Sequence, residues 1–483
     1  MSANPKEADV IVIGSGGAGL AAALSAAEGG SSVIVFEKER SAGGSSNFFK
    51  GMFAVESEMQ WQRNIEYSRD EAFRNMIEYS HWRANPHIVR AYVNESAETI
   101  AWLQTQGVEF IDVTNNMIKS PRTYHVMKGE GAALIKTLVI RAREKGASVI
   151  LGVPVKRIVK EGDRVTGVII EENEEDKKVN ARAVVIATGG FTNNKEWVKK
   201  YTGFDLGVNL LPLGNVDKMG DGIRMAWEIG AAEEGLGNVE LYRTGPIMPD
   251  SVEGGGAIDF AVIQPDLWVS PQGERFCDES TTFFDTSSGN ANARFKEGYT
   301  FTLFDSTIKQ AMIEKGVERS MAIHFPTGYR VRDLDTALND AAAKGSKEIL
   351  EANSVEELAT RMGVDPTVLK NTVEEYNAFC RKGHDDLFIK DPRYLRELKG
   401  PKYYAIKAYT SSLGTMGGIK INQKTEVLDK KNRVIPGLYA VGLDAGGIHG
   451  NDYPIQFVSG TGAGWALNSG RIAGKNILRY LKK

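Results

Sequence analysis

The sequence predicts an α/β protein in which a domain built on a parallel sheet is discontinuous and is interrupted by an inserted α+β domain. In the first half, short β-branched runs alternate with alanine-rich helical stretches, which is typical of a parallel sheet. From about residue 236 to 400 the chain changes to glycine-rich loops, scattered aromatic residues and separate helices, and after about 405 the strand-turn-helix style returns. We therefore predict one domain from residues 1–235 and 401–483, and an inserted domain from residues 236–400.

Length and composition exclude several classes of protein. A chain of 483 residues is too long for a single core, and a net charge of −3 argues against a nucleic-acid-binding surface. Cys277 and Cys380 lie far apart, and the six histidines show no metal-ligand spacing, so we expect neither a disulfide framework nor a metal site. The polar N-terminus does not resemble a secretory signal, and small residues interrupt the apolar stretch 10–27, so we expect a cytoplasmic protein without a membrane span.

The first element is a buried strand from Asp9 that runs into a G-x-G-x-x-G loop and an alanine-rich helix. Gly14 suits the tight turn, Gly16 allows the backbone to approach a pyrophosphate, and Gly19 allows close packing of helix on strand. The N-terminus of the helix presents free N–H groups to phosphates. This loop alone is a weak signal, because the glycines could serve only a tight turn.

The next strand strengthens the interpretation. Residues 33–36 form a second β-branched run, and Glu37 follows it, 23 residues after Gly14, where a carboxylate can hold ribose hydroxyls. The complete strand-helix-strand unit predicts a dinucleotide-binding site. NAD and FAD share this pattern, and no second unit of the kind is visible, so a separate NAD domain is not supported.

Hydrophobic periodicity and turn-forming residues such as Gly and Pro indicate the remaining elements. The predicted helices are 133–146, 306–315, 366–381 and 462–481; the predicted strands are 148–152, 164–171, 183–187 and 434–441, with a charged hairpin tip at 171–178.

A series of motifs in a fixed order covers nearly the whole chain. They are Glu37-Lys38, Gly43-Gly44-Ser45-Ser46, Lys50-Gly51-Met52, residues 183–191 (AVVIATGGF), Gly220-Asp221-Gly222, residues 273–279 (GERFCDE), Thr415-Met416-Gly417-Gly418, residues 435–442 (IPGLYAVG) and residues 446–450 (GGIHG). In this order they resemble the fumarate reductase and succinate dehydrogenase flavoprotein superfamily. The resemblance implies a Rossmann-like FAD-binding domain with an inserted capping domain.

The resemblance also implies which residues contact FAD. The helix that opens at Gly462 and Ala463 is expected to point its positive end at the flavin and to stabilise an anionic reduced form. The family's acidic residue after Tyr-Ala-x-Gly is here Leu443, with Asp444 one position later, so the ribityl contact of Asp444 stays open. Because the family members with covalent flavin carry a histidine where Ser45 and Ser46 stand, we expect non-covalent FAD. The full set of expected contacts is Gly14, Gly16, Ala18, Gly19, Glu37, Lys38, Gly43, Gly44, Ser45, Ser46, Gly51, Val155, Gly189, Asp221, Asp444, Gly462 and Ala463.

The family's dicarboxylate-binding residues are absent. Where the resemblance places the acid arginine, the chain has Thr281-Thr282-Phe283, and the histidine before Thr-Met-Gly-Gly is Gly414. The arginine of His-Gly-x-x-Arg is Tyr453, and the His-Pro-Thr region is residues 241–244 (LYRT). Fumarate and succinate are therefore not expected as substrates.

The segment from Tyr453-Pro454 to Gly462 instead resembles the tyrosine-containing segment of 3-ketosteroid dehydrogenases. Tyr453 is the first candidate to polarise or protonate a substrate, although it could equally be a tyrosine packed in a loop. Arg294, Tyr242 and Arg243 are weaker candidates, and His449 is expected to shape the cofactor site. A cluster of aromatic residues inclines the substrate towards a cyclic or aromatic compound, unless they pack in a core: Phe260, Trp268, Phe283, Phe284 and Phe295.

We therefore predict an FAD-dependent oxidoreductase that reduces or forms a carbon–carbon double bond conjugated to a carbonyl. It would act on a small molecule and exchange electrons with an external donor or acceptor. Two alternatives stay open: an oxidase of a C–N or C–O bond, and a hydratase, isomerase or electron-transfer subunit in which the flavin has another role.

Overall fold

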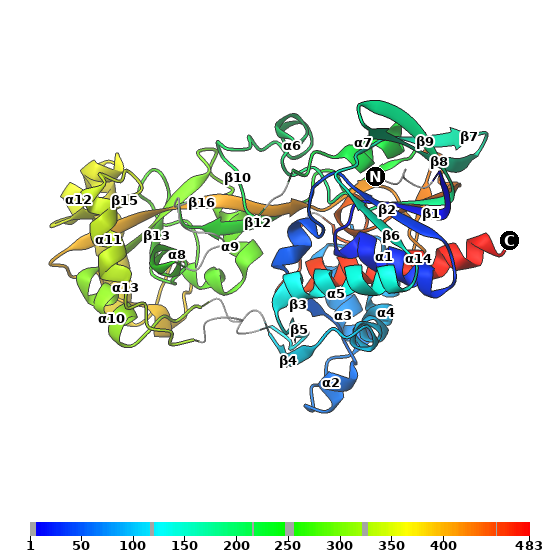
Figure 1. Ribbon diagram of the computed structural model, residues 1–483. Coiled ribbons are helices and arrows are strands. Elements are labelled where there is room, and N and C mark those ends of the chain that lie inside the picture. Colours follow the sequence, from blue (N-terminus) through cyan, green and yellow to red (C-terminus); the bar gives the residue numbers. More distant parts are fainter. Residues whose placement is uncertain (1–5, 116–119, 215–216, 247–255, 321–326, 451) are drawn as a thin grey trace.

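The protein consists of two lobes joined by a long strand (Figure 1). The computed structural model describes residues 6–115, 120–214, 217–246, 256–320, 327–450 and 452–483. We call the larger lobe, which contains both chain ends in Figure 1, the sheet lobe, and the smaller one the cap. The predicted α/β class with a discontinuous first domain is confirmed, because strands from both ends of the chain share one sheet.

An eight-stranded sheet forms the centre of the sheet lobe. Its order is β18-β19-β9-β1-β2-β6, with β8 paired to β9 and β7 to β8. The pairs β1–β2, β1–β9, β2–β6 and β9–β19 are parallel, and Leu438 of β19 lies beside Val184 of β9. The strands are β1 Glu7–Ile13, β2 Val33–Glu37, β6 Ser148–Leu151, β7 Val155–Glu161, β8 Arg164–Glu172, β9 Glu175–Ile186, β18 Glu426–Leu428 and β19 Val434–Ala440. The charged hairpin lies between β8 and β9, as the sequence predicts.

Helices α1 (Gly17–Glu28) and α14 (Thr461–Leu481) pack against each other beside this sheet, with α5 (Glu130–Glu144) next to α1. Small residues allow the close approach of α1 and α14. A methyl group on Gly470 would lie 2.1 Å from the carbonyl oxygen of Ala18, and one on Gly474 would lie 2.6 Å from Cβ of Ser25. The C-terminal helix is thereby held against the helix that opens the nucleotide-binding unit.

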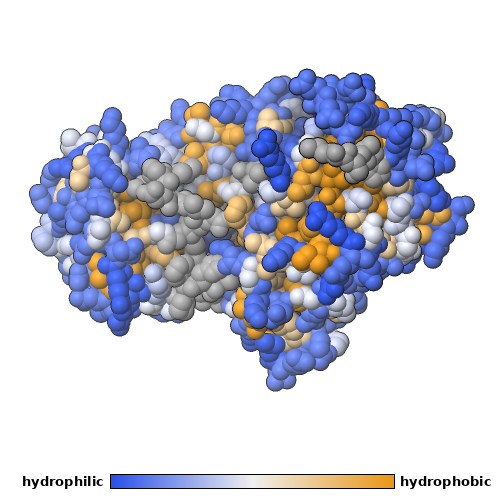
Figure 2. Space-filling view, viewed as in Figure 1, coloured by the Kyte–Doolittle hydropathy of each residue, from blue (hydrophilic) through white to orange (hydrophobic). Residues whose placement is uncertain are grey.

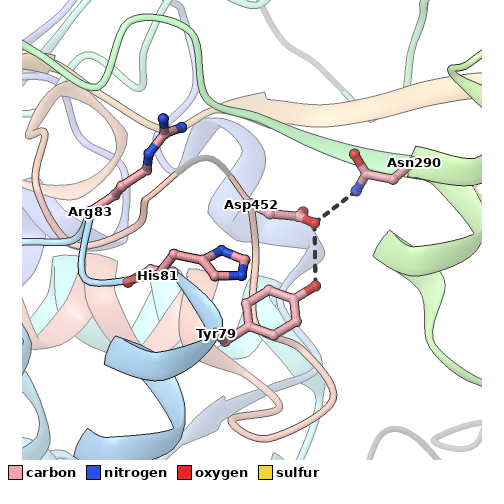
Figure 3. A pocket seen from close by; sticks show the side chains of 6 residues that line it. Tyr79, His81, Arg83, Asn290 and Asp452 are labelled. Atoms are coloured by element: carbon pink, nitrogen blue, oxygen red, sulfur yellow. Dashed lines mark hydrogen bonds between the residues drawn. The ribbon is translucent and has the colours of Figure 1, made fainter.

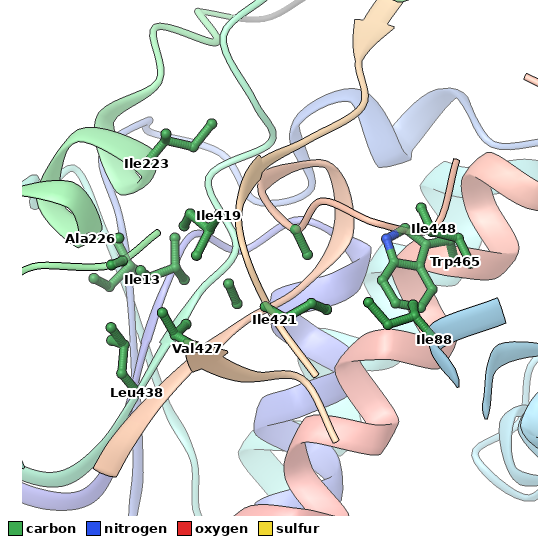
Figure 4. Close-up of a cluster of buried hydrophobic side chains, with 14 of the residues drawn as sticks. Ile13, Ile88, Ile223, Ala226, Ile419, Ile421, Val427, Leu438, Ile448 and Trp465 are labelled. Carbon is green, nitrogen blue, oxygen red and sulfur yellow. The ribbon is translucent and has the colours of Figure 1, made fainter. Parts of the chain in front are cut away.

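Branched aliphatic side chains fill the core between the sheet and the elements on its other face (Figure 4). Ile13, Ile223, Ile421 and Leu438 are fully or almost fully buried. Burying a side chain of this size contributes roughly 1.5–3 kcal/mol. The elements on that face and around it are α3 Arg69–Tyr79, α4 Pro86–Thr105, α6 Lys195–Thr202, α7 Asp221–Glu228, β11 Glu233–Glu234, β17 Gly418–Ile419 and η4 Gly442–Asp444.

A small antiparallel sheet, in the order β3-β5-β4, borders the sheet lobe. Its elements and their neighbours are η1 Gly44–Phe48, β3 Gly51–Phe53, α2 Glu58–Trp61, β4 Phe110–Thr114 and β5 Tyr124–Met127. The backbone N–H of Phe53 donates to the carbonyl of Gly460 at 3.0 Å, so β3 is bonded to the turn that precedes α14.

The cap is built on a second sheet, in which β16 is the central strand. The order is β10-β16-β14-β13, and β12 and β15 also pair with β16. The cap strands are β10 Leu211–Pro212, β12 Val239–Thr244, β13 Leu267–Val269, β14 Tyr299–Asp305, β15 Ile349–Ala352 and β16 Tyr403–Thr415. Its helices are α8 Ala257–Val262, η2 Glu279–Phe283, α9 Asp285–Asn292, α10 Ser306–Glu314, α11 Leu334–Ala343, α12 Val355–Met362, α13 Pro366–Lys382 and η3 Pro392–Tyr394.

The sheet of the cap takes two strands from outside residues 236–400, namely β10 and β16. In Figure 1, β16 runs from the cap towards the sheet lobe. The division of the chain at residues 236 and 400 therefore stays a prediction, and β16 is the element that links the two lobes.

Two further observations concern surfaces and ions. None of the described helices is long and apolar enough to cross a membrane. Within the same ranges, no group of three or more His, Cys, Asp or Glu residues is placed to hold a metal ion. Figure 2 shows hydrophilic outer ends on both lobes, with apolar side chains gathered on the part of the sheet lobe that carries β2 and β6.

Candidate functional site

The first part of the site is the glycine loop between β1 and α1. Gly14 has a φ of 102°, and a methyl group there would lie 2.3 Å from the carbonyl oxygen of Ala187. A methyl group on Gly19 would lie 2.1 Å from the carbonyl oxygen of Gly14. Both positions require glycine, the first for its left-handed turn and close approach, the second for the packing of α1 on β1.

The space in front of this loop is open. A methyl group on Gly16 would meet nothing nearer than Oγ of Ser46 at 3.7 Å, and one on Gly44 would meet nothing within 4 Å. The N–H of Gly17 donates to Oγ of Ser46 at 2.9 Å, and α1 has no other side-chain cap. The N-terminus of α1 and the Gly43–Ser46 segment thus form an open, glycine-lined cradle, and its contact with a diphosphate stays a prediction.

Glu37, at the end of β2, faces the same loop. Its Oε2 accepts hydrogen bonds from N–H and Oγ of Ser15 at 2.8 and 2.7 Å, and its Oε1 accepts from the N–H of Glu39. Lys38 forms ion pairs with Asp217 at 2.7 Å and Asp221 at 3.0 Å. The sequence-predicted residues Glu37, Lys38 and Asp221 are therefore brought to one edge of the sheet.

The other predicted cofactor contacts lie around this cradle. Ser45 Oγ donates to the carbonyl of Gly214 at 3.2 Å, and Gly43 is the residue before η1. Gly51 opens β3, and Val155 opens β7. Their contacts with the cofactor stay predictions.

Asp444 is fully buried and holds the turn that follows β9. Its carboxylate accepts hydrogen bonds from the N–H and hydroxyl of Thr188 and from the N–H groups of Gly189 and Gly190, the last two at 3.0 and 2.9 Å. Burial raises its pKa, although the backbone N–H groups act in the opposite direction. Asp444 thus shapes the Thr-Gly-Gly turn, and its predicted ribityl contact stays a prediction.

Tyr453 lies at the N-terminus of α14. Its hydroxyl oxygen accepts a hydrogen bond from the N–H of Gly462 at 2.7 Å, so its own hydroxyl hydrogen is directed elsewhere. Burial raises the pKa of this phenol, while the Gly462 N–H acts in the opposite direction. The phenol is therefore protonated at neutral pH and faces the positive end of a helix.

Apolar side chains surround Tyr453. Met416 and Ile455 form a buried cluster with it, and Phe284 and Leu443 pack against this cluster. The hydroxyl of Thr286 in α9 donates to the carbonyl of Tyr453 at 3.0 Å, so the cap contacts the Tyr453 loop directly. This part of the site suits an uncharged organic group.

His449 is buried next to Tyr453, with ring centroids 5.3 Å apart. Burial lowers its pKa to about 3, so the imidazole is neutral at neutral pH. Within the described ranges its Nδ1 has no hydrogen-bond partner. This placement agrees with the expectation that His449 shapes the site and does not donate a proton.

Tyr242 and Glu240 lie side by side on β12. The Tyr242 hydroxyl donates to Oε1 of Glu240. Burial raises the pKa of Glu240 to about 7, although the bond from Tyr242 and the charge of Lys218 act in the opposite direction. Burial also lowers the pKa of Lys218 to about 8, against the charges of Glu240 and Asp444. Glu240 and Lys218 are thus buried groups whose charges influence each other, and Tyr242 is half-buried beside Glu240.

The other predicted catalytic residues are placed differently. The Arg294 guanidinium donates to the carbonyl of Phe276 at 3.3 Å, a contact within the cap. Arg243 donates to Val262, Thr300 and Thr302 and lies 3.8 Å from the ring centroid of Trp268. These contacts give both arginines a structural role, and the catalytic role of Arg294 stays an untested prediction.

An arginine from another segment reaches the position where the resemblance places an acid arginine. Arg319 forms an ion pair with Asp285, and its Nη1 donates to Oγ1 of Thr282 at 3.4 Å. The charge is thus neutralised by a carboxylate of the cap. Sequence order could not reveal this contact, because Arg319 is 34 residues from Asp285.

A pocket opens beside the Tyr453 loop (Figure 3). Its volume is about 750 Å³, and it is lined by Tyr79, Ser80, His81, Arg83, Asn290 and Asp452. Asp452 accepts hydrogen bonds from the Tyr79 hydroxyl at 3.2 Å and from Nδ2 of Asn290 at 2.9 Å. Asn290 belongs to α9 of the cap and Tyr79 to α3 of the sheet lobe, so the pocket lies between the lobes.

The family model described as "FAD binding domain" matches residues 9–453. The chain belongs to this family. The match includes the glycine cradle, the Thr-Gly-Gly turn and the cap. The open glycines at the N-terminus of α1, with Glu37 beside them, fit the diphosphate and ribose of FAD, and FAD is therefore the cofactor of the protein.

Two curated proteins illustrate the range of relatives. The chain is 34% identical to a vinyl phenol reductase of Lactiplantibacillus plantarum, over 98% of this chain and 96% of that one. It is 31% identical to an NADH:fumarate oxidoreductase of Klebsiella pneumoniae, over 93% of this chain but only 46% of that one.

Solved structures show the same fold. A flavocytochrome c3 fumarate reductase in an open conformation superposes with a TM-score of 0.73, at 25% identity, over 99% of this chain and 80% of that one. A 3-ketosteroid Δ1-dehydrogenase of Sterolibacterium denitrificans gives a TM-score of 0.80 at 21% identity, over 98% and 100%. The chain is therefore an FAD-dependent oxidoreductase of the class that acts on carbon–carbon bonds, as the sequence predicts.

The sequence reasoning missed Lys218, Glu240, Arg319 and Asp452. For Glu240 a signal existed, because the alternation Glu-x-Tyr in a strand places Glu240 and Tyr242 on one face. Lys218 and Asp452 lie in loops, where no periodicity indicates which side chains are buried.

Proposed function

We propose that this protein reduces a carbon–carbon double bond conjugated to an aromatic ring or to a carbonyl, in an uncharged cyclic or aromatic substrate. The observation that carries the proposal is the bond from the Gly462 N–H to the Tyr453 oxygen, within an apolar cluster. This arrangement provides a proton donor next to an uncharged substrate. The relative that reduces a vinyl phenol supports the aromatic substrate class.

In this proposal Tyr453 is the acid. When the phenol gives its proton to the substrate carbon, the phenolate that remains accepts the N–H of Gly462 at the N-terminus of α14. The partial positive charge of that helix end stabilises the phenolate. The FAD that the glycine cradle would hold would supply the hydride to the neighbouring carbon, so that one hydride and one proton together saturate the double bond.

Dicarboxylates are not expected because, among the described residues, the two arginines nearest to the Tyr453 cluster are engaged within the cap: Arg319 is paired with Asp285, and Arg243 donates to the carbonyl of Val262. Arg83 lines the pocket of Figure 3 together with Asp452, so a cation and a carboxylate stand in the same pocket. The pocket of Figure 3, next to the Tyr453 loop, is the proposed route for the substrate.

Three further features belong to the proposal. The FAD is bound non-covalently, since Ser45 and Ser46 offer no histidine for attachment. The electrons come from an external donor, and the compartment is the cytoplasm, where the free thiols of Cys277 and Cys380 are stable.

The test is a half-reaction without oxygen. The bound flavin is reduced with dithionite and mixed with 4-vinylphenol, with a cyclic enone or with fumarate, and the return of the oxidised absorbance is followed. We expect reoxidation by 4-vinylphenol or the enone and none by fumarate. Reoxidation by fumarate alone, or by none of the three, contradicts the proposal.

A further inference from the structure

Leu443 lies where two parts of the site meet. It is the middle residue of η4 (Gly442–Asp444), and its side chain is half-buried. On one side, a methyl group on Gly190 of the Thr-Gly-Gly turn would lie 3.6 Å from Cβ of Leu443. On the other side, Leu443 packs against the buried cluster that contains Tyr453. The leucine therefore connects the turn that follows β9 with the proposed acid.

The backbone at Leu443 is held by two other elements. The N–H of Gly442 donates to Oγ of Ser469 at 2.9 Å, and the carbonyl of Gly442 accepts from the indole N–H of Trp465 at 2.9 Å, so α14 fixes this residue. The carbonyl of Leu443 itself accepts the N–H of Gly417, just after β16, at 3.2 Å. A side chain on a backbone fixed in this way keeps one position relative to the Tyr453 cluster.

Gly414 of β16 leaves the space that Leu443 fills. A methyl group on Gly414 would lie only 3.0 Å from Cδ1 of Leu443, and its next neighbour would be Oγ1 of Thr192 at 4.0 Å. Gly414 does not have a left-handed backbone, so its conformation does not require glycine. The glycine matters for the space that it leaves. Leu443 occupies the volume into which a side chain at position 414 would project, next to Met416 and Tyr453.

An apolar side chain in this position favours one class of substrate. A carboxylate placed against Leu443 would lose hydration, and the leucine offers it neither a hydrogen bond nor an opposite charge. An uncharged ring loses little hydration there and gains from the contact with a branched side chain. The contact between Gly414 and Leu443 thus gives the site next to Tyr453 an apolar wall.

We propose that Leu443, in the space beside Gly414, is the residue that selects an uncharged ring over a charged group next to Tyr453. This inference rests on the proposed function, in which Tyr453 gives its proton to the substrate. Leu443 exchanges neither a proton nor an electron. It contacts the ring and determines specificity, and Gly414 acts through Leu443 because any side chain at position 414 would displace the leucine.

The first experiment measures binding without turnover in the FAD-loaded protein. 4-Ethylphenol ends in a methyl group where 4-hydroxyphenylacetate ends in a carboxylate, and each is titrated while the absorbance of the oxidised flavin is followed. We expect the wild type to bind 4-ethylphenol at least about 10-fold more tightly, because the carboxylate would be desolvated without a partner. Equal affinity for the two ligands, tighter binding of the carboxylate, or binding of neither overturns the inference.

Leu443→Gln tests the residue itself, because it keeps a side chain of similar size and replaces the apolar surface with an amide. We expect the affinity for 4-ethylphenol to fall by about 10-fold and the ratio of the two affinities to fall by about 5-fold or more. Leu443→Met stays apolar and should keep the ratio within about 3-fold of the wild type. Leu387→Gln makes the same exchange at a leucine of the cap that is 51% exposed, and is the control. An unchanged ratio in Leu443→Gln overturns the inference.

The contact between positions 414 and 443 gives a second test, which does not depend on the Leu443→Gln variant being folded. Gly414→Ala should weaken the binding of 4-ethylphenol by about 5-fold, because the methyl group forces Leu443 towards the ring. In the double variant Gly414→Ala/Leu443→Ala the two small side chains share the space. Its loss of affinity should therefore be smaller than the product of the two single losses by about 3-fold or more. A loss equal to that product shows that the two positions do not share one space, and overturns the inference.

Turnover separates this inference from the proposed function. A wild type that binds 4-ethylphenol selectively, but whose reduced flavin no alkene reoxidises, overturns the proposed function and leaves the ligand selection by Leu443 intact. A wild type that reduces 4-vinylphenol, while Leu443→Gln keeps the ligand preference of the wild type, overturns the inference alone.

Discussion

At the scale of single residues, Tyr453 combines two properties that a proton donor requires. It is protonated, because burial raises its pKa, and its oxygen already accepts the Gly462 N–H. Removing the hydroxyl leaves the ring in its apolar cluster but removes the proton. Tyr453→Phe should therefore lower kcat by about 100-fold or more and leave FAD affinity unchanged.

The measurement is the rate of flavin reoxidation at saturating substrate, with bound FAD determined from its absorbance. Tyr299→Phe is the control, since Tyr299 is half-buried in the cap away from the Tyr453 cluster. A kcat within twofold of the wild type would show that another group donates the proton.

A second residue-scale prediction concerns the cradle. Gly16 has room for a methyl group in the protein itself, whereas Gly19 has none, because a methyl group there would lie 2.1 Å from the Gly14 oxygen. Gly16→Ala should leave the unfolding temperature of the apoprotein nearly unchanged and weaken FAD binding by about 10-fold or more, since the methyl group fills the diphosphate space. Gly19→Ala should destabilise the apoprotein by about 1–3 kcal/mol.

Thermal unfolding without FAD and a fluorescence titration with FAD check both substitutions. Gly237→Ala is the control, because its methyl group would meet only the Tyr201 carbonyl at 3.5 Å. Equal FAD affinity in Gly16→Ala and in the wild type would mean that the diphosphate lies elsewhere.

At the scale of elements, the sequence predicted the sheet lobe well because its signals are local. The strand-loop-helix unit from β1 to α1 is encoded in consecutive residues, and the predicted strand 434–441 corresponds to β19, Val434–Ala440. The polar contacts between lobes depend on tertiary packing. Glu240 and Lys218 come from β12 and a loop, and neither pattern indicates that both side chains are buried. Arg294 was a weaker candidate from the sequence, and its hydrogen bond goes to Phe276 within the cap.

The helix α9 provides the element-scale prediction. Its residue Asn290 lines the pocket of Figure 3 and donates to Asp452. Asn290→Trp should fill the pocket and raise KM for 4-vinylphenol by about 10-fold, because access is narrowed while Tyr453 is unchanged. Steady-state kinetics check this, with Asn290→Asp as the variant that keeps the size. An unchanged KM in Asn290→Trp would show that the substrate enters by another route.

At the scale of the whole molecule, the strand β16 decides how independent the two lobes are. It pairs with β14 from Tyr403 to Tyr409 and with β12 from Tyr409 to Thr415, so one strand connects most of the cap sheet. The segment 236–400 contains β12, β13, β14 and β15 but lacks β16, and would leave three of these strands without their common partner.

We therefore expect the isolated segment 236–400 not to fold, whereas the segment 236–416, which adds β16, forms a cap with native strand content. Circular dichroism and the dispersion of amide resonances distinguish the two. The physical reason is that β16 supplies the hydrogen bonds of β12, β14 and β15, and unpaired buried backbone groups are costly. A folded 236–400 segment would place the domain boundary where the sequence predicted it, and would make β16 a connection between lobes and not the centre of one.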